Sequence, residues 1–238
     1  MKKHYNAILF DLDGTLLPMD MDEFTSGYFR YLAVKLAPLG ISHEDLVPAV
    51  WKGTGAMVKN DGSATNREVF WKTFEALTGY SEAVAGDLCL DFYGNEFHQA
   101  KQFTGENKRA KEAVEIARQK AQKVILATNP LFPMCGQKTR LSWIGLKPED
   151  FDAVTAYEES RYCKPNPDYF KAVLKENGLQ PEECLMIGND EREDMLAGTI
   201  AGMDCYLVTD TMIACEEHPW TGDKGTFEDL IQALKELD

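Results

Sequence analysis

The chain has 238 residues, of which 44% are hydrophobic and 27% charged, as in an ordinary globular protein that can bury a sizeable core. Its 25 basic and 39 acidic residues give a formal net charge of −14 at pH 7. This balance argues against binding to nucleic acid or to an anionic membrane, because both need basic surface. Any anionic substrate must be attracted by a local field, against the repulsion of the whole molecule.

The cysteine pattern and the N-terminal sequence favour the cytosol. The six cysteines form no Cys-x-x-Cys pair and no zinc-ligand spacing, and several lie within apolar runs. We therefore expect reduced thiols in the core. Residues 1–6 contain no signal-peptide segment, and no later stretch is long enough to span a membrane. We expect a cytoplasmic protein that is a monomer or a weak homodimer.

The first expected strand, Ala7–Phe10, is followed directly by two acids. Asp11 and Asp13 stand at positions i and i+2, and Gly14 and Thr15 close the turn. Unpaired carboxylates at the end of a buried strand cost desolvation free energy, which a hard cation can offset. Mg2+ prefers oxygen ligands and often holds a phosphate in the same shell. The alternative is a plain strand-to-loop turn, which Asp and Gly also favour.

The next segment, residues 19–102, is expected to be entirely helical. Phe24, Tyr28 and Leu32 recur at four-residue spacing, as in an amphipathic helix. The expected helices are Met21–Leu36 and residues 42–59, 66–77, 81–92 and 93–99. Because a crossover between neighbouring strands needs far fewer residues, we predict a helical cap of residues 19–102. The core then comprises residues 1–18 and 103–238. The alternative is that these helices only cover the sheet.

Strands and helices alternate in the rest of the chain. The expected strands are residues 124–127, 153–155, 184–187 and 205–208. The expected helices are residues 105–120, 137–143, 168–177, 193–201 and 227–237. This alternation predicts an α/β fold: a Rossmann-like parallel sheet with helices on both faces, plus the inserted all-helical cap.

Polar residues follow the expected strands, at the edge where an open parallel sheet binds its ligands. They are Asp11 and Asp13 after the first strand, Thr128 and Asn129 after the second, Lys164 after the third, and residues 188–194 after the fourth. Each is weak evidence alone, because such residues are common in turns and helix caps. Their occurrence behind four successive apolar runs predicts a single site.

With these four motifs the chain resembles the haloacid dehalogenase superfamily of phosphohydrolases, in the subclass with a helical cap after the first motif. The resemblance covers essentially the whole chain and does not specify the substrate. It implies that Asp11 is the nucleophile, which forms an aspartyl-phosphate, and that Asp13 is the general acid and base. It also implies that the Thr128 hydroxyl binds phosphate and that Lys164 steadies nucleophile and phosphate.

The chemistry of such a site requires screening of charge. A carboxylate attacks a phosphate dianion poorly unless a cation lies between them, and Mg2+ and a lysine provide that screening. We therefore expect Mg2+ as the cofactor, held in part by Asp11 and Asp13, and a small phosphorylated metabolite as the substrate. Asn129 and the turn residues Gly14 and Thr15 are expected to help bind the phosphate.

The metal ligand in the fourth motif is ambiguous. Members of the superfamily often have an acid directly after the glycine, but this chain has Asn189 there. Counting back four residues from Asp194 selects Asp190 instead. We favour Asp190 as the direct ligand, with Asn189 as the alternative. Asp194 is then expected to lie behind the ligands and orient water or Lys164.

Other functions remain open at this point. A phosphomutase of the hexose-phosphate mutase type would share the nucleophile, the acid and the cap. A non-catalytic regulatory protein that binds phosphate compounds is a further alternative. Haloacid dehalogenation is less expected, because the dehalogenases lack an acid at the position of Asp13 and need no metal. Trp51, Lys52 and Arg67 are candidate cap residues for contact with the substrate.

Overall fold

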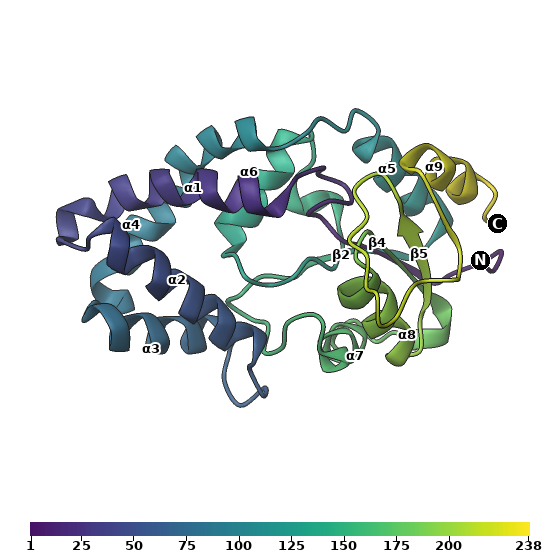
Figure 1. Ribbon diagram of the computed structural model, residues 1–238. Helices are drawn as coiled ribbons and strands as arrows, with labels where there is room; N and C mark the ends of the chain where they lie inside the picture. The colour runs from purple at the N-terminus through teal and green to yellow at the C-terminus, as the bar shows by residue number, and fades with distance from the viewer.

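The computed structural model describes all 238 residues and contains a six-stranded parallel sheet at one end of an elongated molecule (Figure 1). The strand order is β3-β2-β1-β4-β5-β6. The strands are β1 (Ala7–Phe10), β2 (Lys123–Leu126), β3 (Ala153–Val154), β4 (Cys184–Gly188), β5 (Asp204–Val208) and β6 (Lys224–Gly225). The predicted α/β class is confirmed. Strand β6 was not predicted, because its two residues, Lys224 and Gly225, form no apolar run.

The register of the central strands brings three loops to one place. Phe10 of β1 pairs with Leu126 of β2 on one side and with Ile187 of β4 on the other. All three strands run in parallel, so the segments that follow them leave the sheet at the same edge. Polar residues behind these strands therefore start as neighbours.

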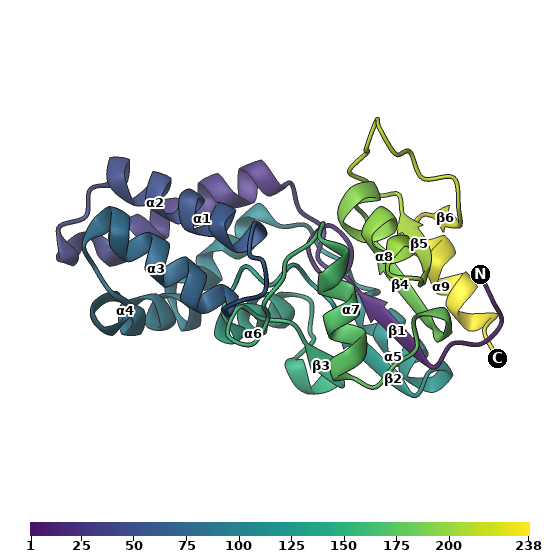
Figure 2. The same cartoon turned by 90° about the horizontal axis from the view of Figure 1, so that it is seen from below.

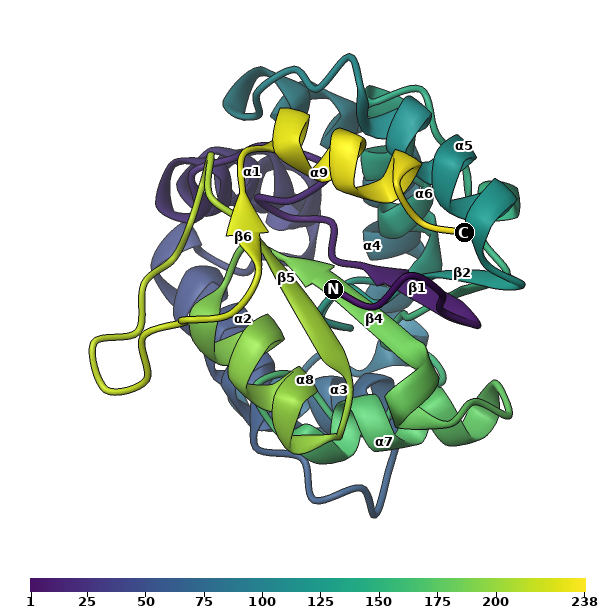
Figure 3. The ribbon, with the colours of Figure 1, turned by 90° about the vertical axis from the view of Figure 1, so that its right-hand side faces the viewer.

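Helices cover both faces of the sheet, as predicted (Figure 3). Ile8 and Phe10 point into one hydrophobic cluster, whereas Ala7 and Leu9 point into another. The first face is covered by α5 (Ala110–Lys120) and α9 (Phe227–Lys235). The second is covered by α7 (Pro167–Glu176), the π-helix η5 (Glu191–Leu196) and α8 (Ala197–Ile200).

A group of helices lies at the opposite end of the molecule from the sheet (Figure 2). It comprises α1 (Met21–Leu36), α2 (His43–Val58), α3 (Asn66–Thr78), α4 (Glu82–Gly94) and the 3-10 segment η2 (Glu96–Phe103). Their ends follow local sequence signals. Ser42 caps α2 by accepting from the N–H of Asp45, and Thr65 and Glu68 form a capping box at α3.

The two connections between the helical cap and the sheet run side by side. Met19 pairs with Thr104 in an antiparallel bridge, and the N–H of Gly105 donates to the carbonyl oxygen of Pro18 at 2.7 Å. The chain thus leaves the core and returns to it at one point, close to the expected boundaries of the cap.

One core helix, α6 (Met134–Trp143), packs against the cap. The ring of Trp143 lies 6.2 Å from that of Phe24 and 5.4 Å from that of Phe97, between centroids. The Thr139 hydroxyl donates to the carbonyl oxygen of Tyr93 at 2.7 Å. A single cluster of 44 buried residues extends from the sheet through α6 into the cap.

Several element boundaries differ from those expected. The helix expected at 105–120 begins at Ala110, and the helix expected at 193–201 is divided between η5 and α8, which ends at Ile200. The remaining short segments are η1 (Ala37–Leu39), η3 (Pro148–Asp150) and η4 (Pro181–Glu183). All six cysteines are free, as expected. None of the helices combines the length and the apolar character needed to cross a membrane.

Candidate active site

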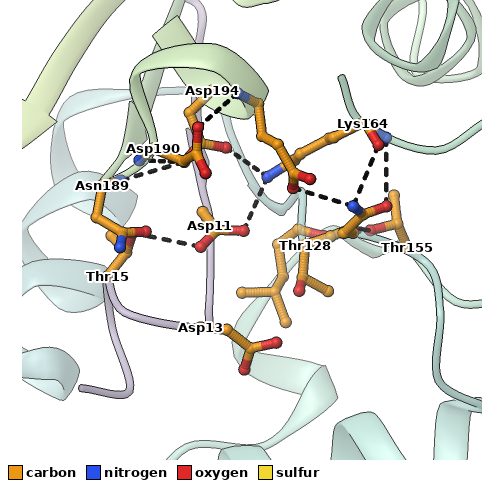
Figure 4. Close-up of polar contacts among 12 residues, drawn as sticks. Asp11, Asp13, Thr15, Thr128, Thr155, Lys164, Asn189, Asp190 and Asp194 are labelled. Atoms are coloured by element: carbon orange, nitrogen blue, oxygen red, sulfur yellow. Dashed lines mark hydrogen bonds and ion pairs between the residues drawn. The ribbon is translucent and has the colours of Figure 1, made fainter. Parts of the chain in front are cut away.

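Side chains from three strand ends converge at the carboxyl edge of the sheet (Figure 4). Asp11 follows β1, Thr128 follows β2 and Asn189 follows β4, and all three line a cavity of about 170 Å3. The site lies at the centre of the sheet because β1 runs between β2 and β4. The structure thus brings together the motifs that the sequence placed far apart.

Lys164 comes from the loop before α7 and is paired with two carboxylates. Its Nζ lies 2.8 Å from Oδ1 of Asp11 and 2.6 Å from Oδ1 of Asp194, and its side chain is only 1% exposed. Burial opposes the charged form, but Asp11 and Asp194 raise the pKa of Lys164 well above its ordinary value. The lysine therefore stays charged and fixes one oxygen of Asp11.

The other oxygen of Asp11 lies beside Asn189. The Thr15 hydroxyl is 3.3 Å from Oδ2 of Asp11 and 3.2 Å from Oδ1 of Asn189. Both oxygens therefore lie within hydrogen-bond distance of the same donor. Gly14 makes this approach possible. Its φ is +83°, and a Cβ there would lie 2.2 Å from Nδ2 of Asn189.

The turn after Asp11 uses some of its own N–H groups. The N–H of Gly14 donates to the Leu17 carbonyl at 2.8 Å, and that of Thr15 donates to the Leu12 carbonyl at 3.2 Å. These two residues shape the turn, so their N–H groups are not free to bind the phosphate expected there. The N–H groups of Leu12 and Asp13 have no acceptor within the protein.

Asp194 lies behind Asp11, where it orients Lys164. Its Oδ2 accepts from the N–H groups of Asn189 and Asp190, both at 3.1 Å. The wide first turn of η5 directs Asp194 back over the end of β4. A Cβ on Gly188 would lie 2.1 Å from Oδ2, so this position requires glycine. Burial raises the pKa of Asp194, although Lys164 opposes the shift.

The two candidate metal ligands of the fourth motif have different surroundings. Oδ1 of Asp190 caps η5 by accepting from the N–H groups of Arg192 and Glu193, at 2.7 and 2.8 Å. Asn189 donates through Nδ2 to a backbone carbonyl 2.7 Å away, which leaves its Oδ1 beside Asp11. Of these two residues, Asn189 is the one linked to Asp11 through a shared donor, the Thr15 hydroxyl.

Asp13 faces α6, where it meets Arg140, a residue that was not predicted to belong to the site. The fully buried Arg140 pairs through Nη1 with Oδ2 of Asp13 and donates through Nη2 to Gln137. Its guanidinium lies 4.1 Å from the ring centroid of Phe132. Oδ1 of Asp13 has no partner. Burial raises the pKa of Asp13, Arg140 lowers it, and the nearby Asp11 raises it further, so that the pKa is above its ordinary value.

Thr128 and Asn129 have different roles. The Thr128 hydroxyl is buried, has no partner and belongs to the cavity wall, so it can bind an anion. The Asn129 amide is already used: its Nδ2 donates to Glu193 at 3.0 Å, and its Oδ1 accepts from the N–H of Lys164 at 3.2 Å. Asn129 therefore holds two loops together. Burial raises the pKa of Glu193 to about 7.

The candidate cap residues do not line the cavity. Trp51 is 53% exposed and packs edge-on against Phe29, and Arg67 pairs with Glu82 on the cap surface. Lys52 is also exposed. The cap contributes a different residue to the cavity wall, Met21 at the start of α1.

The donors fit a hard cation, although no three His, Cys, Asp or Glu side chains form a metal-binding group. Oδ2 of Asp11 and Oδ1 of Asn189 adjoin the same hydroxyl, whereas the carboxylate of Asp13 pairs with Arg140. The cavity is lined by five carboxylates, whereas only Lys164 and Arg140 are nearby as cations. A divalent cation that prefers oxygen ligands suits this excess of negative charge.

The fold and the site place an aspartate directly after the first strand, beside a buried lysine and an unpartnered threonine hydroxyl. A family model for haloacid dehalogenase-like hydrolases matches residues 5–202, and the chain belongs to this family. The match confirms the family and the enzyme class expected from the four motifs, a phosphoric monoester hydrolase of the haloacid dehalogenase type.

Individual relatives are distant but align over nearly the full length. The pyrophosphatase PpaX of Bacillus cereus (strain AH820) is 25% identical over 207 residues, which cover 87% of this chain and 84% of PpaX. The magnesium-bound hydrolase YfnB of Bacillus subtilis is 22% identical, with a TM-score of 0.59 and coverage of 98% and 99%. A predicted phosphoglycolate phosphatase from Haemophilus somnus 129PT is 20% identical, with a TM-score of 0.60 and the same coverage. These structures establish the shared fold.

Proposed function

We propose that the protein is a Mg2+-dependent phosphatase that hydrolyses a small phosphorylated metabolite through an aspartyl-phosphate on Asp11. One observation carries this proposal: Asp11, which is buried and bound to Lys164, lines the same cavity as the unpartnered hydroxyl of Thr128. The cavity, at about 170 Å3, is smaller than the ~300–1,000 Å3 of pockets for drug-sized ligands. A small substrate suits that volume.

In the first step a carboxylate oxygen of Asp11 attacks phosphorus, and the bond between phosphorus and the ester oxygen breaks. Oδ1 of Asp13 gives its proton to the leaving alcohol, which the raised pKa of this carboxyl favours. The oxygens of the transferring phosphoryl group gain negative charge. Lys164, the Thr128 hydroxyl and the N–H groups of Leu12 and Asp13 can stabilise that charge.

In the second step water attacks the phosphorus of the aspartyl-phosphate. Asp13 takes a proton from this water, the bond between phosphorus and Asp11 breaks, and inorganic phosphate leaves. Both catalytic carboxylates return to their starting states. Asp13 can serve both steps because Arg140 holds one of its oxygens and leaves the other free.

The residues best suited to hold Mg2+ are Asp11 and Asn189. When bound, Mg2+ would screen the repulsion between the nucleophile and the phosphate. This choice revises the preference for Asp190, one of whose oxygens caps η5. Binding of Mg2+ to the folded protein should raise the melting temperature. Asn189→Ala should reduce that shift more than Asp190→Ala does, and the reverse order would restore Asp190 as the ligand.

A phosphate-release assay tests the proposed function. Purified protein is offered sugar phosphates, polyol phosphates, nucleotides and p-nitrophenyl phosphate, with Mg2+ or with EDTA. We expect release that depends on Mg2+ and falls at least about 100-fold in Asp11→Asn. Equal release by this variant would refute the mechanism. Isomerised esters without net phosphate release would indicate a phosphomutase. A cytoplasmic location and a monomeric or weakly dimeric state remain predictions.

A further inference from the structure

The ionisable side chains that line the active-site cavity are all acidic. They are Asp11, Asp13, Asp190, Glu193 and Asp194, and no lysine or arginine joins them. The two cations of the site, Lys164 and Arg140, are buried behind this wall and already paired with carboxylates. Their side chains are 1% and 0% exposed and are absent from the cavity wall, so neither is presented to a second anionic group of a substrate.

The mouth of the cavity has the same character. The cavity adjoins an open groove of about 470 Å3, with which it shares Asp13, Met21, Asn189 and Ile213. The other charged residues of the groove, Asp20 and Asp22, are also acidic. Met21 and Ile213 are 40% and 45% exposed, so the rim combines negative charge with apolar surface.

The two ends of a bound phosphate ester contact different walls. The phosphoryl group must reach Asp11, which lies beside the free Thr128 hydroxyl. The alcohol part then faces the rest of the wall, where the hydrophobic residues are Met21, Leu131, Phe132 and Ile213. No lysine or arginine lines that part of the wall.

We propose that the alcohol part of the substrate carries no second anionic group: it is uncharged or cationic, with an apolar portion against Met21 and Ile213. This inference rests on the phosphatase function proposed above. A carboxylate or second phosphate would lie among acidic side chains without a counter-ion, in a protein of net charge −14. The substrate proposed here thus differs from pyrophosphate and phosphoglycolate, the compounds in the names of two similar proteins, because both of those carry a second anionic group.

Three two-carbon esters of nearly equal size test the proposal: carboxymethyl phosphate, 2-hydroxyethyl phosphate and 2-aminoethyl phosphate. Each competes with p-nitrophenyl phosphate above neutral pH with Mg2+, so an inhibition constant is obtained whether or not the ester is hydrolysed. We expect the carboxymethyl ester to bind at least about tenfold more weakly than the hydroxyethyl ester, a difference of ~1.4 kcal/mol. The aminoethyl ester should bind at least as tightly as the neutral one.

A charge added at the mouth provides the matched comparison. Ile213→Lys introduces a cation into the wall and should reduce the tenfold difference to about threefold or less. Ile200→Lys makes the same change at a 57% exposed position on α8, outside the cavity, and should leave the difference unchanged. Both sites are exposed, so neither lysine must be buried.

The outcomes separate this inference from the proposed function. Equal inhibition constants, or tighter binding of the carboxymethyl ester, would overturn the charge selection and leave the phosphatase intact. An equal effect of both lysine variants would overturn the placement of the alcohol at Ile213. Failure to release phosphate from p-nitrophenyl phosphate and from every other ester of the assay panel would refute the proposed function itself.

Discussion

Arg140 determines the surroundings of Asp13 from a helix that contributes no other charge to the site. The arginine is fully buried, and its partners are the carboxylate of Asp13, the amide of Gln137 and the ring of Phe132. Removing one partner of a buried ion pair leaves an uncompensated charge in the interior. Asp13 therefore depends on Arg140 for stability as well as for orientation.

Arg140→Met should lower the free energy of unfolding by about 3–5 kcal/mol, because Asp13 loses its buried counter-ion. Arg118→Met is the control, since Arg118 is 44% exposed and its nearest carboxylate, on Asp152, lies 3.8 Å away. The control should change stability by less than about 1 kcal/mol. Urea titrations measure both variants, and equal losses would contradict the importance of the buried pair.

Two glutamates of η5 should affect stability with opposite pH dependence. Burial raises the pKa of Glu193 from 4.5 to about 7, so the folded state holds this proton more tightly and stability falls as pH rises through that window. Hydrogen bonds from the N–H groups of Cys215 and Trp220 lower the pKa of Glu191. Its contribution is present above its ordinary pKa and is lost as pH falls through the lowered value.

In metal-free protein, Glu193→Gln should gain stability relative to the wild type as pH rises between about 4.5 and 7, by roughly 1–3 kcal/mol. Glu191→Gln is the matched control and should lose stability at neutral pH, with a smaller loss in acid. Unfolding free energies at several pH values measure both. Parallel pH profiles of the two variants would rule out the assigned pKa shifts.

At the scale of residues, the strand-end groups were predictable and their partners were not. Asp11, Thr128 and Lys164 follow apolar runs, and the topology of a parallel sheet places strand ends together. Arg140 lies on a helix, and its direction depends on how α6 rotates against the sheet and cap. The sequence contained only a weak signal for a role of Arg140 at the site. Gln137 and Arg140 stand three residues apart, on one face of the helix that follows Thr128.

At the scale of elements, the start of α3 fixes the cap to the two loops that carry Asn129 and Lys164. The N–H groups of Asn66 and Arg67 donate to the carbonyl oxygens of Ser160 and Tyr157, at 2.8 and 2.9 Å. These bonds satisfy donors that a helix start otherwise leaves free. The buried Asn66 amide also lies 3.3 Å from the Pro130 carbonyl and 3.2 Å from Sγ of Cys163.

Asn66→Ala should destabilise the protein by about 1–3 kcal/mol, because it leaves buried polar groups of the core without a partner. Pro130 and Cys163 adjoin Asn129 and Lys164, so we also expect kcat to fall. Asn95→Ala is the control: that exposed side chain bonds only to Asp91 within its own helical turn. Thermal unfolding and steady-state kinetics measure both variants. Similar effects of the two substitutions would argue against a role of Asn66 in holding the cap to the loops.

The elements themselves were predicted best where a periodic hydrophobic pattern repeats over several turns. Met21–Leu36 matches the expected first cap helix residue for residue, because its apolar side chains repeat over four turns. The π-helix η5 was missed, since its wide turn depends on the bonds from Asn189 and Asp190 to Asp194 rather than on a sequence period. The packing of α6 on the cap was also missed, because periodicity identifies an apolar face without its partner.

At the scale of the whole molecule, the cap and the sheet share one interior. Phe24 and Phe97 of the cap contact Trp143 of α6, and Tyr28 lies 5.8 Å from the ring of Phe132. The same hydrophobic cluster includes Phe10 of β1. Aromatic contacts of this kind couple the stability of the two parts.

We therefore expect a single cooperative unfolding transition, with equal calorimetric and van't Hoff enthalpies. Phe97→Ala should lower the free energy of unfolding by about 3–5 kcal/mol. The midpoint of the transition should fall, but the transition should remain single. Scanning calorimetry of the wild type and this variant provides the measurement. Two resolved transitions in the wild type would show that the cap and the sheet unfold independently.

Trapping of the acyl phosphate tests the central claim most directly. The protein is mixed with p-nitrophenyl phosphate and Mg2+, quenched during turnover and treated with borohydride, which reduces an aspartyl-phosphate to homoserine. Peptide mass spectrometry should find homoserine at position 11, only when substrate is present, and none in Asp11→Asn. Steady phosphate release with Asp11 unmodified, or homoserine at position 13 instead, would contradict a covalent mechanism through Asp11.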